Sequence, residues 1–336
     1  MKYRKTILIN ASAAKTGGAE TILKTFVKEL EVRSEYDFVI LSPIVFQSDF
    51  SHISFKLLKT NGFQTIYFTI LGIRKYINVY KPLKVISFNN LNYLFINNMG
   101  VTYFHQAKAL DSTYSDFKIK VYRFIINKFL RKNLFIVQSE YIRNKFINSF
   151  NFDSNKVISS WPGFTIPETK KLPIFTKNTN FDHYGLLPIS YSSEHKNVAF
   201  LNELKDFFVS EKLSVLTLLN KSNDIFDNDF ENIQSIGAIT RSEMFYLYEN
   251  VDFLIFTSKD ETVGLPIFEF LQTGKPAFVY AADYAIEFYN QFNKPKNFIL
   301  YTDVEDFKIL FLKNINVKAE NYNYSRGEWN KILDTL

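Results

Sequence analysis

The chain has 336 residues, more than a single hydrophobic core usually supports, and 46% of them are hydrophobic, so we expect two domains, each with its own core. It contains no cysteine, which excludes disulfides, thiolate metal sites and thiol nucleophiles and fits a reducing compartment.

The net charge of +6 is unevenly distributed along the chain. Residues 1–165 carry +13 and the remainder carries −7. A basic half indicates an anionic partner, either nucleic acid or lipid and its phosphates, while a solvated basic surface without a partner explains the same count.

The sequence favours neither a membrane-spanning nor a secreted protein. Met1–Asn10 is a short basic lead with few apolar residues, unlike a secretory signal or an anchor. The apolar run Phe63–Ile73 is shorter than the roughly 18 residues that a membrane span requires. We therefore expect a cytoplasmic protein, soluble or peripheral on the inner face of the membrane.

In chain order, the first half alternates short apolar runs with helical patterns. This alternation predicts crossover connections and a parallel sheet. The expected strands are Lys5–Ile9, Phe38–Leu41, Leu83–Phe88, Val101–Phe104 and Leu134–Val137, and the expected helices are Ala19–Leu30, Phe68–Val79, Asp116–Lys132 and Glu140–Asn148.

Between Phe150 and Pro173 the periodicity lapses and prolines accumulate, which is typical of a linker. The alternation then resumes. Expected helices are Lys196–Phe208, Arg241–Asn250 and Leu265–Leu271, and expected strands are Leu213–Leu218, Ile233–Ile236, Phe253–Phe256 and Ala277–Tyr280. We thus predict an α/β protein with two doubly wound Rossmann-like domains, 1–160 and 161–325, facing a central cleft, and a terminal helix 326–336 that packs back on the first.

The segment Ser258–Lys275, which directly follows the strand VDFLIF, carries the most specific chemistry. Glu261 and Glu269 are separated by seven residues that include Gly264 and Pro266, which suits the start of a helix. Carboxylates are strong acceptors for sugar hydroxyls, and free amides at a helix start favour an anion such as a diphosphate.

This segment resembles the E-x7-E element of retaining glycosyltransferases of family 4, which have the GT-B fold. The family form E-x-F-G-L-P-x-x-E is matched by ETVGLPIFE, and TGKPAFV follows. The resemblance implies that Glu261 contacts the transferred sugar and that Glu269 contacts the ribose hydroxyls. It also implies that the amides of Val263, Gly264 and Leu265 contact the sugar and phosphates.

The resemblance extends into the first half. Thr16–Glu20 is similar to the family's G-G-A-E turn, where Gly17 and Gly18 would approach the phosphates or the acceptor. His105 follows the strand VTYF, where family members place a histidine near the donor sugar. Ser139 is expected to cap the helix within VQSEYIRNKF.

Further matches lie in the second half. EHKNVAFL is similar to the family's H-K-N variant, which implies that Lys196 lies near the diphosphate. Many members carry an arginine where this chain has Ser190, so neutralisation of the diphosphate would depend on Lys196 and helix amides. The backbone of Gly237, Ala238 and Ile239 would line the nucleobase. Trp329 is expected in a core.

A competing motif is Asp227-Asn228-Asp229, the D-x-D spelling of metal-dependent glycosyltransferases. It lies in a polar stretch without a buried strand leading in, so a metal site is disfavoured. We expect no essential metal and no resident cofactor, because the nucleotide-sugar is a substrate.

The sequence therefore predicts a retaining glycosyltransferase of the hexosyltransferase type. It would move a sugar from a UDP-, GDP- or dTDP-sugar to a hydroxyl of a glycan or lipid-linked glycan in bacterial surface polysaccharide synthesis. The basic, apolar segment Asp116–Lys132 indicates an anionic membrane surface as a further partner. An ordinary amphipathic core helix with a basic outer face is the alternative interpretation of the same pattern.

Three other classes also remain open. A nucleotide-sugar epimerase of the same architecture would use the same donor, and a non-catalytic transferase-like partner subunit would explain Ser190. A nucleic-acid binder would explain the basic half but not the segment from Glu261 to Glu269, so no nucleic-acid partner is expected.

Overall fold

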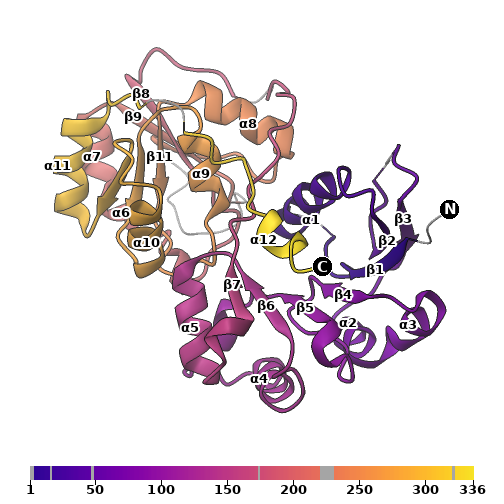
Figure 1. Ribbon diagram of the computed structural model, residues 1–336. Helices are drawn as coiled ribbons and strands as arrows, with labels where there is room; N and C mark the ends of the chain where they lie inside the picture. The colour runs from indigo at the N-terminus through magenta and orange to yellow at the C-terminus, as the bar shows by residue number, and fades with distance from the viewer. Residues whose placement is uncertain (1–3, 16, 47–48, 173–174, 220–230, 320–321) are drawn as a thin grey trace. The chain divides into compact units, whose positions relative to one another are not determined.

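The structure is a computed structural model that describes residues 4–15, 17–46, 49–172, 175–219, 231–319 and 322–336. The chain divides into two compact units (Figure 1). The N-terminal unit comprises Met1–Thr165 and Arg326–Leu336, and the C-terminal unit comprises Ile166–Ser325. The change of unit after Thr165 falls inside the expected linker.

Among its described residues, the N-terminal unit has a seven-stranded parallel sheet in the order β3-β2-β1-β4-β5-β6-β7. The strands are β1 (Lys5–Asn10), β2 (Tyr36–Ser42), β3 (Ile53–Leu57), β4 (Lys84–Ser87), β5 (Gly100–Tyr103), β6 (Leu134–Val137) and β7 (Val157–Ser159). The α-helices are α1 (Gly17–Leu30), α2 (Phe63–Tyr67), α3 (Arg74–Tyr80), α4 (Phe117–Phe129), α5 (Glu140–Phe150) and α12 (Asn330–Leu333). A π-helix, η1 (Phe68–Gly72), and three 3₁₀ turns, η2 (Asn97–Met99), η3 (Ala107–Leu110) and η4 (Ser154–Lys156), complete the unit.

The C-terminal unit has a parallel sheet in the order β10-β9-β8-β11-β12-β13. Its strands are β8 (His183–Leu187), β9 (Leu213–Thr217), β10 (Ile233–Ser235), β11 (Phe253–Phe256), β12 (Ala277–Tyr280) and β13 (Phe298–Tyr301). Its helices are η5 (Glu194–Lys196, 3₁₀), α6 (Phe200–Glu203), α7 (Lys205–Ser210), α8 (Arg241–Asn250), α9 (Leu265–Leu271), α10 (Asp283–Gln291) and α11 (Val304–Asn314). The fold class expected from the sequence is thus confirmed in both sheets.

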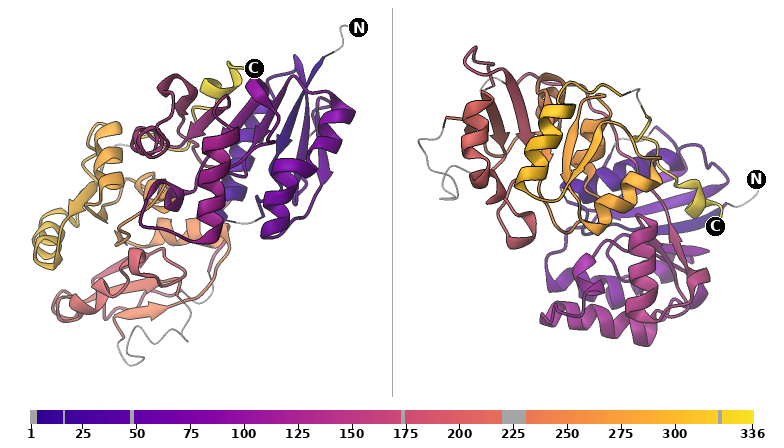
Figure 2. Two further views of the ribbon diagram at one scale, coloured as in Figure 1. Left: turned by 90° about the horizontal axis from the view of Figure 1, so that it is seen from below. Right: turned by 90° about the vertical axis from the view of Figure 1, so that its left-hand side faces the viewer.

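The central strands are buried on both faces, as parallel strands covered by helices must be. In β1, Ile7 and Ile9 pack in a cluster with residues of α1, while Leu8 packs in a second cluster with Phe68 and Ile73 on the opposite face. Figure 2 shows helices on both sides of the N-terminal sheet. This arrangement leaves the carboxyl edge of each sheet to carry the polar side chains.

The end of the chain belongs to the N-terminal unit, where α12 lies beside α1 (Figure 1). Trp329 is 1% exposed and its ring centroid lies 5.1 Å from that of Phe26. The expected core role of Trp329 is therefore confirmed. The expected helix 326–336 was too long, because only Asn330–Leu333 is α-helical.

The expected helix Lys196–Phe208 is wrong at its start. Lys196 ends the 3₁₀ turn η5, and Asn197 takes a left-handed conformation with φ of 47°, which stops a helix. The helical residues that follow are split into α6 and α7 at Leu204. Similarly, the expected helix Phe68–Val79 is not one α-helix but the π-helix η1 followed by α3, and α2 directly precedes it.

Several elements escaped the sequence analysis. β7 lies inside the expected linker, and β3 is a short edge strand. β8 carries Gly185, which weakens a strand pattern. A Cβ at Gly185 would lie 2.4 Å from the ring of Phe253, so the glycine makes room for that side chain in the core. α10, β13 and α11 were also missed.

Within the described residues, no helix combines the length and the apolar character that a membrane crossing requires.

Candidate functional site

Several candidate residues lie where the strand order of each sheet reverses, which is the usual ligand position in doubly wound folds. In the N-terminal unit the reversal is between β1 and β4, and in the C-terminal unit it is between β8 and β11. The loops after β8 and β11 carry Lys196 and Glu261. The loop after β1 leads to Gly17, the first residue of α1, and the loop after β4 carries Asn89 and Asn90.

Lys196 and Glu261 form an ion pair, although 65 residues separate them in the sequence. Both side chains are largely shielded, with 11% and 19% exposure. The Lys196 ammonium also lies 5.4 Å from the ring centroid of Tyr191. The structure thus brings together the two side chains that were expected at the diphosphate and at the sugar.

Hydrogen bonds fasten the two loops to each other. The Thr257 hydroxyl donates to the Lys196 carbonyl at 2.6 Å, and the Lys259 amide donates to the His195 carbonyl at 2.7 Å. The hydroxyl of Tyr284, on α10, donates to the Ser258 carbonyl at 2.9 Å. The ion pair therefore stands on loops whose backbones are held in register by buried contacts.

The loop from Glu261 enters α9 through Gly264, the N-cap residue, which has φ of 65°. This left-handed conformation favours glycine, and Pro266 follows at a position where a missing N–H costs nothing. Val263 is 5% exposed and packs inward. The G-L-P part of the motif is thus explained by the turn itself, and the backbone of residues 263–265 forms the start of α9.

Glu269, expected at the ribose, is 4% exposed and faces the protein. Its carboxylate pairs with the Arg241 guanidinium at 2.6 Å and accepts a hydrogen bond from the Tyr248 hydroxyl at 3.2 Å. Burial raises the pKa of Glu269, and Arg241 and Tyr248 oppose that rise. Arg241 and Tyr248, both on α8, were not singled out by the sequence analysis.

A pocket of about 390 Å³ borders this carboxylate, on the side of α8 and α9. Its lining residues are Ile166, Phe245, Tyr248, Glu249, Glu269, Gln272, Thr273 and Lys275. Lys196 and Glu261 are not among them. Glu269 therefore belongs to a different part of the C-terminal unit from the Lys196–Glu261 pair.

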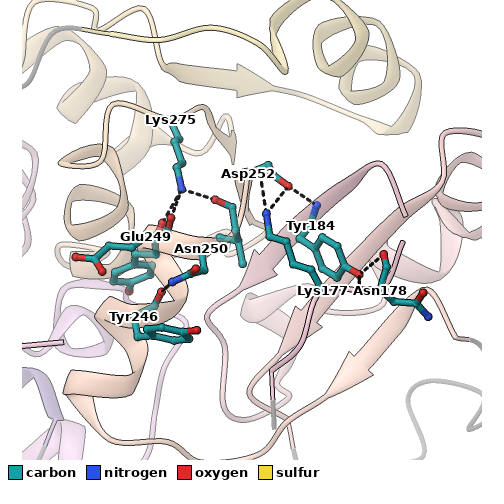
Figure 3. Close-up of polar contacts among 10 residues, drawn as sticks. Lys177, Asn178, Tyr184, Tyr246, Glu249, Asn250, Asp252 and Lys275 are labelled. Carbon is teal, nitrogen blue, oxygen red and sulfur yellow. Dashed lines mark hydrogen bonds and ion pairs between the residues drawn. The ribbon is translucent and has the colours of Figure 1, made fainter. Parts of the chain in front are cut away.

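Lys275 supports this region by binding the end of α8 (Figure 3). Its ammonium donates to the carbonyls of Tyr248, Glu249 and Val251 at 3.3, 2.6 and 2.6 Å. Beside it, Asp252 pairs with Lys177 at 3.3 Å and accepts from the Tyr184 amide (Figure 3). Lys275, in the segment TGKPAFV, therefore holds the end of α8 in place.

The segment Gly237–Ile239, expected at the nucleobase, follows β10 and leads into α8. Gly237 has φ of 72°. Thr240 and Glu243 then form a reciprocal capping box at the helix start. Because Arg241 is the first residue of α8, Thr240 alone separates this segment from the partner of Glu269 in the sequence.

In the N-terminal unit, Gly17 begins α1 with φ of 66°. No heavy atom lies within 4 Å of where a Cβ would stand on Gly17 or Gly18, among the residues that the structure describes. The open surroundings leave both backbones accessible, as the expected approach of a ligand requires. Thr16 lies outside the described residues.

A buried asparagine network, missed by the sequence analysis, holds the loop that leads to Gly17. The Asn89 amide donates to the Ser12 and Thr69 hydroxyls at 2.9 Å and to the Asn10 side-chain oxygen at 3.1 Å. Its own oxygen accepts from the Ala13 amide at 3.1 Å. Thr69 comes from the π-helix η1, a type of distortion that recurs at functional sites.

His105 lies just beyond β5, at the same edge of the sheet. Its ring nitrogen Nε2 lies 3.3 Å from the Asn90 side-chain nitrogen, and its backbone amide donates to the Asn90 side-chain oxygen at 2.6 Å. Burial lowers the pKa of His105 from its usual 6.5 to about 4. The imidazole is therefore neutral at physiological pH.

Ser139 accepts a hydrogen bond from the Ile142 amide at 3.2 Å and caps α5, as expected. Ser190 is exposed. Asp227-Asn228-Asp229 lies outside the described residues. Across the part of the chain that is described, no group of three or more His, Asp and Glu side chains is placed to hold a metal ion.

No protein-family model and no curated protein matches the chain. Solved structures do share its fold. HepE from Anabaena, solved with UDP and glucose, is 16% identical, with 93% of this chain and 89% of that chain covered and a TM-score of 0.61. WaaG, a glycosyltransferase involved in lipopolysaccharide biosynthesis, is 11% identical, with 92% and 89% covered and a TM-score of 0.60.

A proposed UDP-N-acetylglucosamine 2-epimerase from Listeria monocytogenes is 13% identical, with 98% and 95% covered and a TM-score of 0.64. At these identities the likeness concerns the fold. The two parallel-sheet units and the solved neighbours establish the GT-B architecture.

Proposed function

We propose that the protein is a retaining glycosyltransferase that moves a sugar from a nucleoside diphosphate sugar to a hydroxyl acceptor. The observation that carries the proposal is the shielded Lys196–Glu261 pair on two fastened loops at the strand-order reversal of the C-terminal sheet. The E-x7-E spelling supports it, as do the GT-B neighbours, one of which was solved with UDP-glucose.

In this proposal the protein orients the donor and stabilises charge. Lys196 neutralises the departing diphosphate, and Glu261 accepts a hydroxyl of the transferred sugar. His105, Gly17 and Gly18 contact the sugar, phosphates or acceptor, and the backbones of residues 237–239 and 263–265 bind the base and the diphosphate. No resident cofactor or essential metal is required, because the diphosphate is already a good leaving group.

In this proposal Glu269 binds the ribose hydroxyls. A ribose hydroxyl that donates to this carboxylate would share it with Arg241 and Tyr248. Because Arg241 opposes the rise in the pKa of Glu269 that burial causes, it would favour the ionised carboxylate that the ribose uses as an acceptor.

Donor binding and transfer test the proposal directly. A screen of UDP-, GDP- and dTDP-sugars should raise the melting temperature with one donor, since a ligand that binds only the folded state stabilises it by mass action. With that donor, Glu261→Gln and Lys196→Ala are each expected to lower the transfer rate by about 100-fold.

The matched controls are Glu305→Gln and Lys308→Ala, which alter an exposed ion pair of the same unit and should keep wild-type rates. Wild-type rates in both site variants would refute the assignment.

A nucleotide-sugar epimerase is the second candidate, favoured by the Listeria structure, which covers 98% of this chain. It would invert the donor's C2 without an acceptor, which product analysis by NMR distinguishes from transfer. Donor binding with neither reaction would identify the remaining alternative, a non-catalytic partner subunit.

For the acceptor, we propose a lipid-linked glycan in surface polysaccharide synthesis, reached at the inner face of the cytoplasmic membrane. The α4 face supports this proposal. Phe117, Phe124 and Phe129 are 71%, 61% and 41% exposed. Exposed lysines lie between them at 118, 120 and 128, and residues 117–139 contain no acidic side chain. Exposed aromatics flanked by cations suit an anionic lipid surface.

Vesicle sedimentation tests this surface. Wild-type protein should sediment with anionic vesicles and be released as salt rises, and Phe117→Ser combined with Phe124→Ser should weaken binding by about tenfold or more. Ile309→Ser, at an exposed apolar residue of the C-terminal unit, is the control. Failure to sediment at every salt concentration would remove the membrane claim.

A further inference from the structure

Asn90 holds His105 by both ends of its side-chain amide. Its oxygen accepts from the His105 backbone amide at 2.6 Å, and its nitrogen lies 3.3 Å from the His105 ring nitrogen Nε2. Asn90 is 7% exposed and has φ of 64°, a conformation in which asparagine is favoured among residues with a side chain.

The hydrogen bond from the His105 backbone amide determines which atom donates in the contact between Asn90 and the His105 ring. A backbone N–H is only a donor, so the atom that faces it must be the Asn90 oxygen. The NH₂ group of Asn90 is then directed at Nε2 and can only donate. Nε2 must therefore carry a lone pair, and the ring proton of the neutral imidazole lies on Nδ1.

The same geometry opposes a positive charge on the ring. In an imidazolium, Nε2–H would point at the NH₂ of Asn90, with two donors facing each other. Tyr103, whose ring centroid is 6.1 Å from that of His105, is the titratable side chain in ring contact with it among the described residues. Burial lowers the pKa of His105 and raises the pKa of Tyr103, so both groups are uncharged at physiological pH.

We propose that Asn90 is a positioning residue of the sugar site: it fixes His105 as an uncharged imidazole whose one donor, Nδ1–H, is offered to a hydroxyl of the ligand. The inference rests on the proposed function. The chemical reason for an uncharged imidazole is that the glycosyl centre becomes cation-like during transfer. A charged histidine nearby would oppose the positive charge that forms there. A neutral donor orients the sugar without this cost.

The tautomer is measurable without donor or turnover. In ¹⁵N-histidine NMR of the full chain, the His105 signals, assigned by their loss in His105→Gln, should show a protonated Nδ1 and an unprotonated Nε2 from about pH 8 to about pH 5.5. A protonated Nε2 in the wild-type protein would overturn the inference.

Two variants test the role of Asn90. Asn90→Asp keeps the shape and tolerates the positive φ, but replaces the NH₂ by an acceptor. It should transfer the ring proton to Nε2, raise the pKa of His105 and lower the transfer rate at least tenfold, with a decline that steepens as pH falls. Asn90→Gly keeps the backbone conformation and should lower the rate roughly fivefold, the value of one neutral hydrogen bond.

The matched control is Asn98→Asp, which introduces the same charge at an exposed asparagine of the same unit and should change neither the tautomer nor the rate. An unchanged tautomer or an unchanged rate in Asn90→Asp would contradict the proposal. If the tautomer is as expected but no donor binds, the proposed function fails while the inference about Asn90 and His105 stands. A protonated Nε2 in the wild-type protein would instead contradict the inference itself.

Discussion

At the residue scale, the C-terminal unit contains carboxylates in two different settings. Glu261 pairs with Lys196 in a shielded but partly accessible position, whereas Glu269 is buried beside Arg241 and Tyr248. A buried carboxylate that loses its cation keeps the full cost of desolvation, so removing one partner is more harmful than removing both. The E-x7-E spelling alone does not distinguish these settings.

A double-mutant cycle tests the buried pair. Arg241→Met should lower the free energy of unfolding by about 3 kcal/mol, because Glu269 stays buried without its cation. Adding Glu269→Gln should restore most of this loss, measured by denaturant unfolding at neutral pH. Arg33→Met, which breaks an ion pair with the exposed Asp334, is the control and should cost about 0.5 kcal/mol. Simple additivity of the two C-terminal changes would argue against the coupling.

The same pair predicts a pH dependence. Burial raises the pKa of Glu269, and loss of Arg241 should raise it further. A carboxyl whose pKa is raised in the folded state is accommodated while protonated, at low pH, and loses stability as pH rises through the folded-state pKa. The Arg241→Met penalty should therefore be larger at about pH 8 than at about pH 5. A penalty that grows towards acid would exclude this explanation.

At the element scale, helix ends determine where the candidate residues lie. Gly264, whose φ of 65° favours glycine, is the N-cap residue that precedes α9, and the carbonyls at the end of α8 accept hydrogen bonds from the ammonium of Lys275. The sequence analysis placed both helices with correct bounds, since their capping residues and periodicity are local features. It failed at Lys196, because the left-handed Asn197 and the hydrogen bond from Thr257 are not visible in a helical pattern.

The cap on α8 gives a prediction of its own. Lys275→Met should lower the free energy of unfolding by about 2 kcal/mol, since three carbonyls at a helix end lose a charged donor. Thermal unfolding measures the loss. Lys313→Met, at an exposed lysine in the last turn of α11, should change stability by less than about 0.5 kcal/mol. Equal effects of the two changes would show that Lys275 does not act as a cap.

At the scale of the whole molecule, each unit contains a hydrophobic cluster built from its own residues. The cluster around Phe26 and Trp329 includes both ends of the chain but belongs to the N-terminal unit. The cluster around Phe278 and Phe311 belongs to the C-terminal unit. Each unit therefore has the core that an independently folding domain requires.

Reciprocal core variants test this independence. Trp329→Ala should destabilise the N-terminal unit by about 4 kcal/mol, and Phe311→Ala should do the same to the C-terminal unit. Hydrogen exchange should then show lost protection in β1–β7 for the first variant and in β8–β13 for the second. Loss of protection in both units from either single variant would show that the chain unfolds as one cooperative body.

The sequence by itself determined the features that depend on neighbours along the chain: the alternation of strands and helices, the cap at Ser139, and the helix that follows Glu261 and Gly264. Such features follow from local backbone preferences and from periodicity. Only the tertiary structure decided which polar groups meet. Lys196 reaches Glu261, Glu269 turns to Arg241, and Asn90 fixes His105 because crossover connections bring distant strand ends to one edge of a sheet.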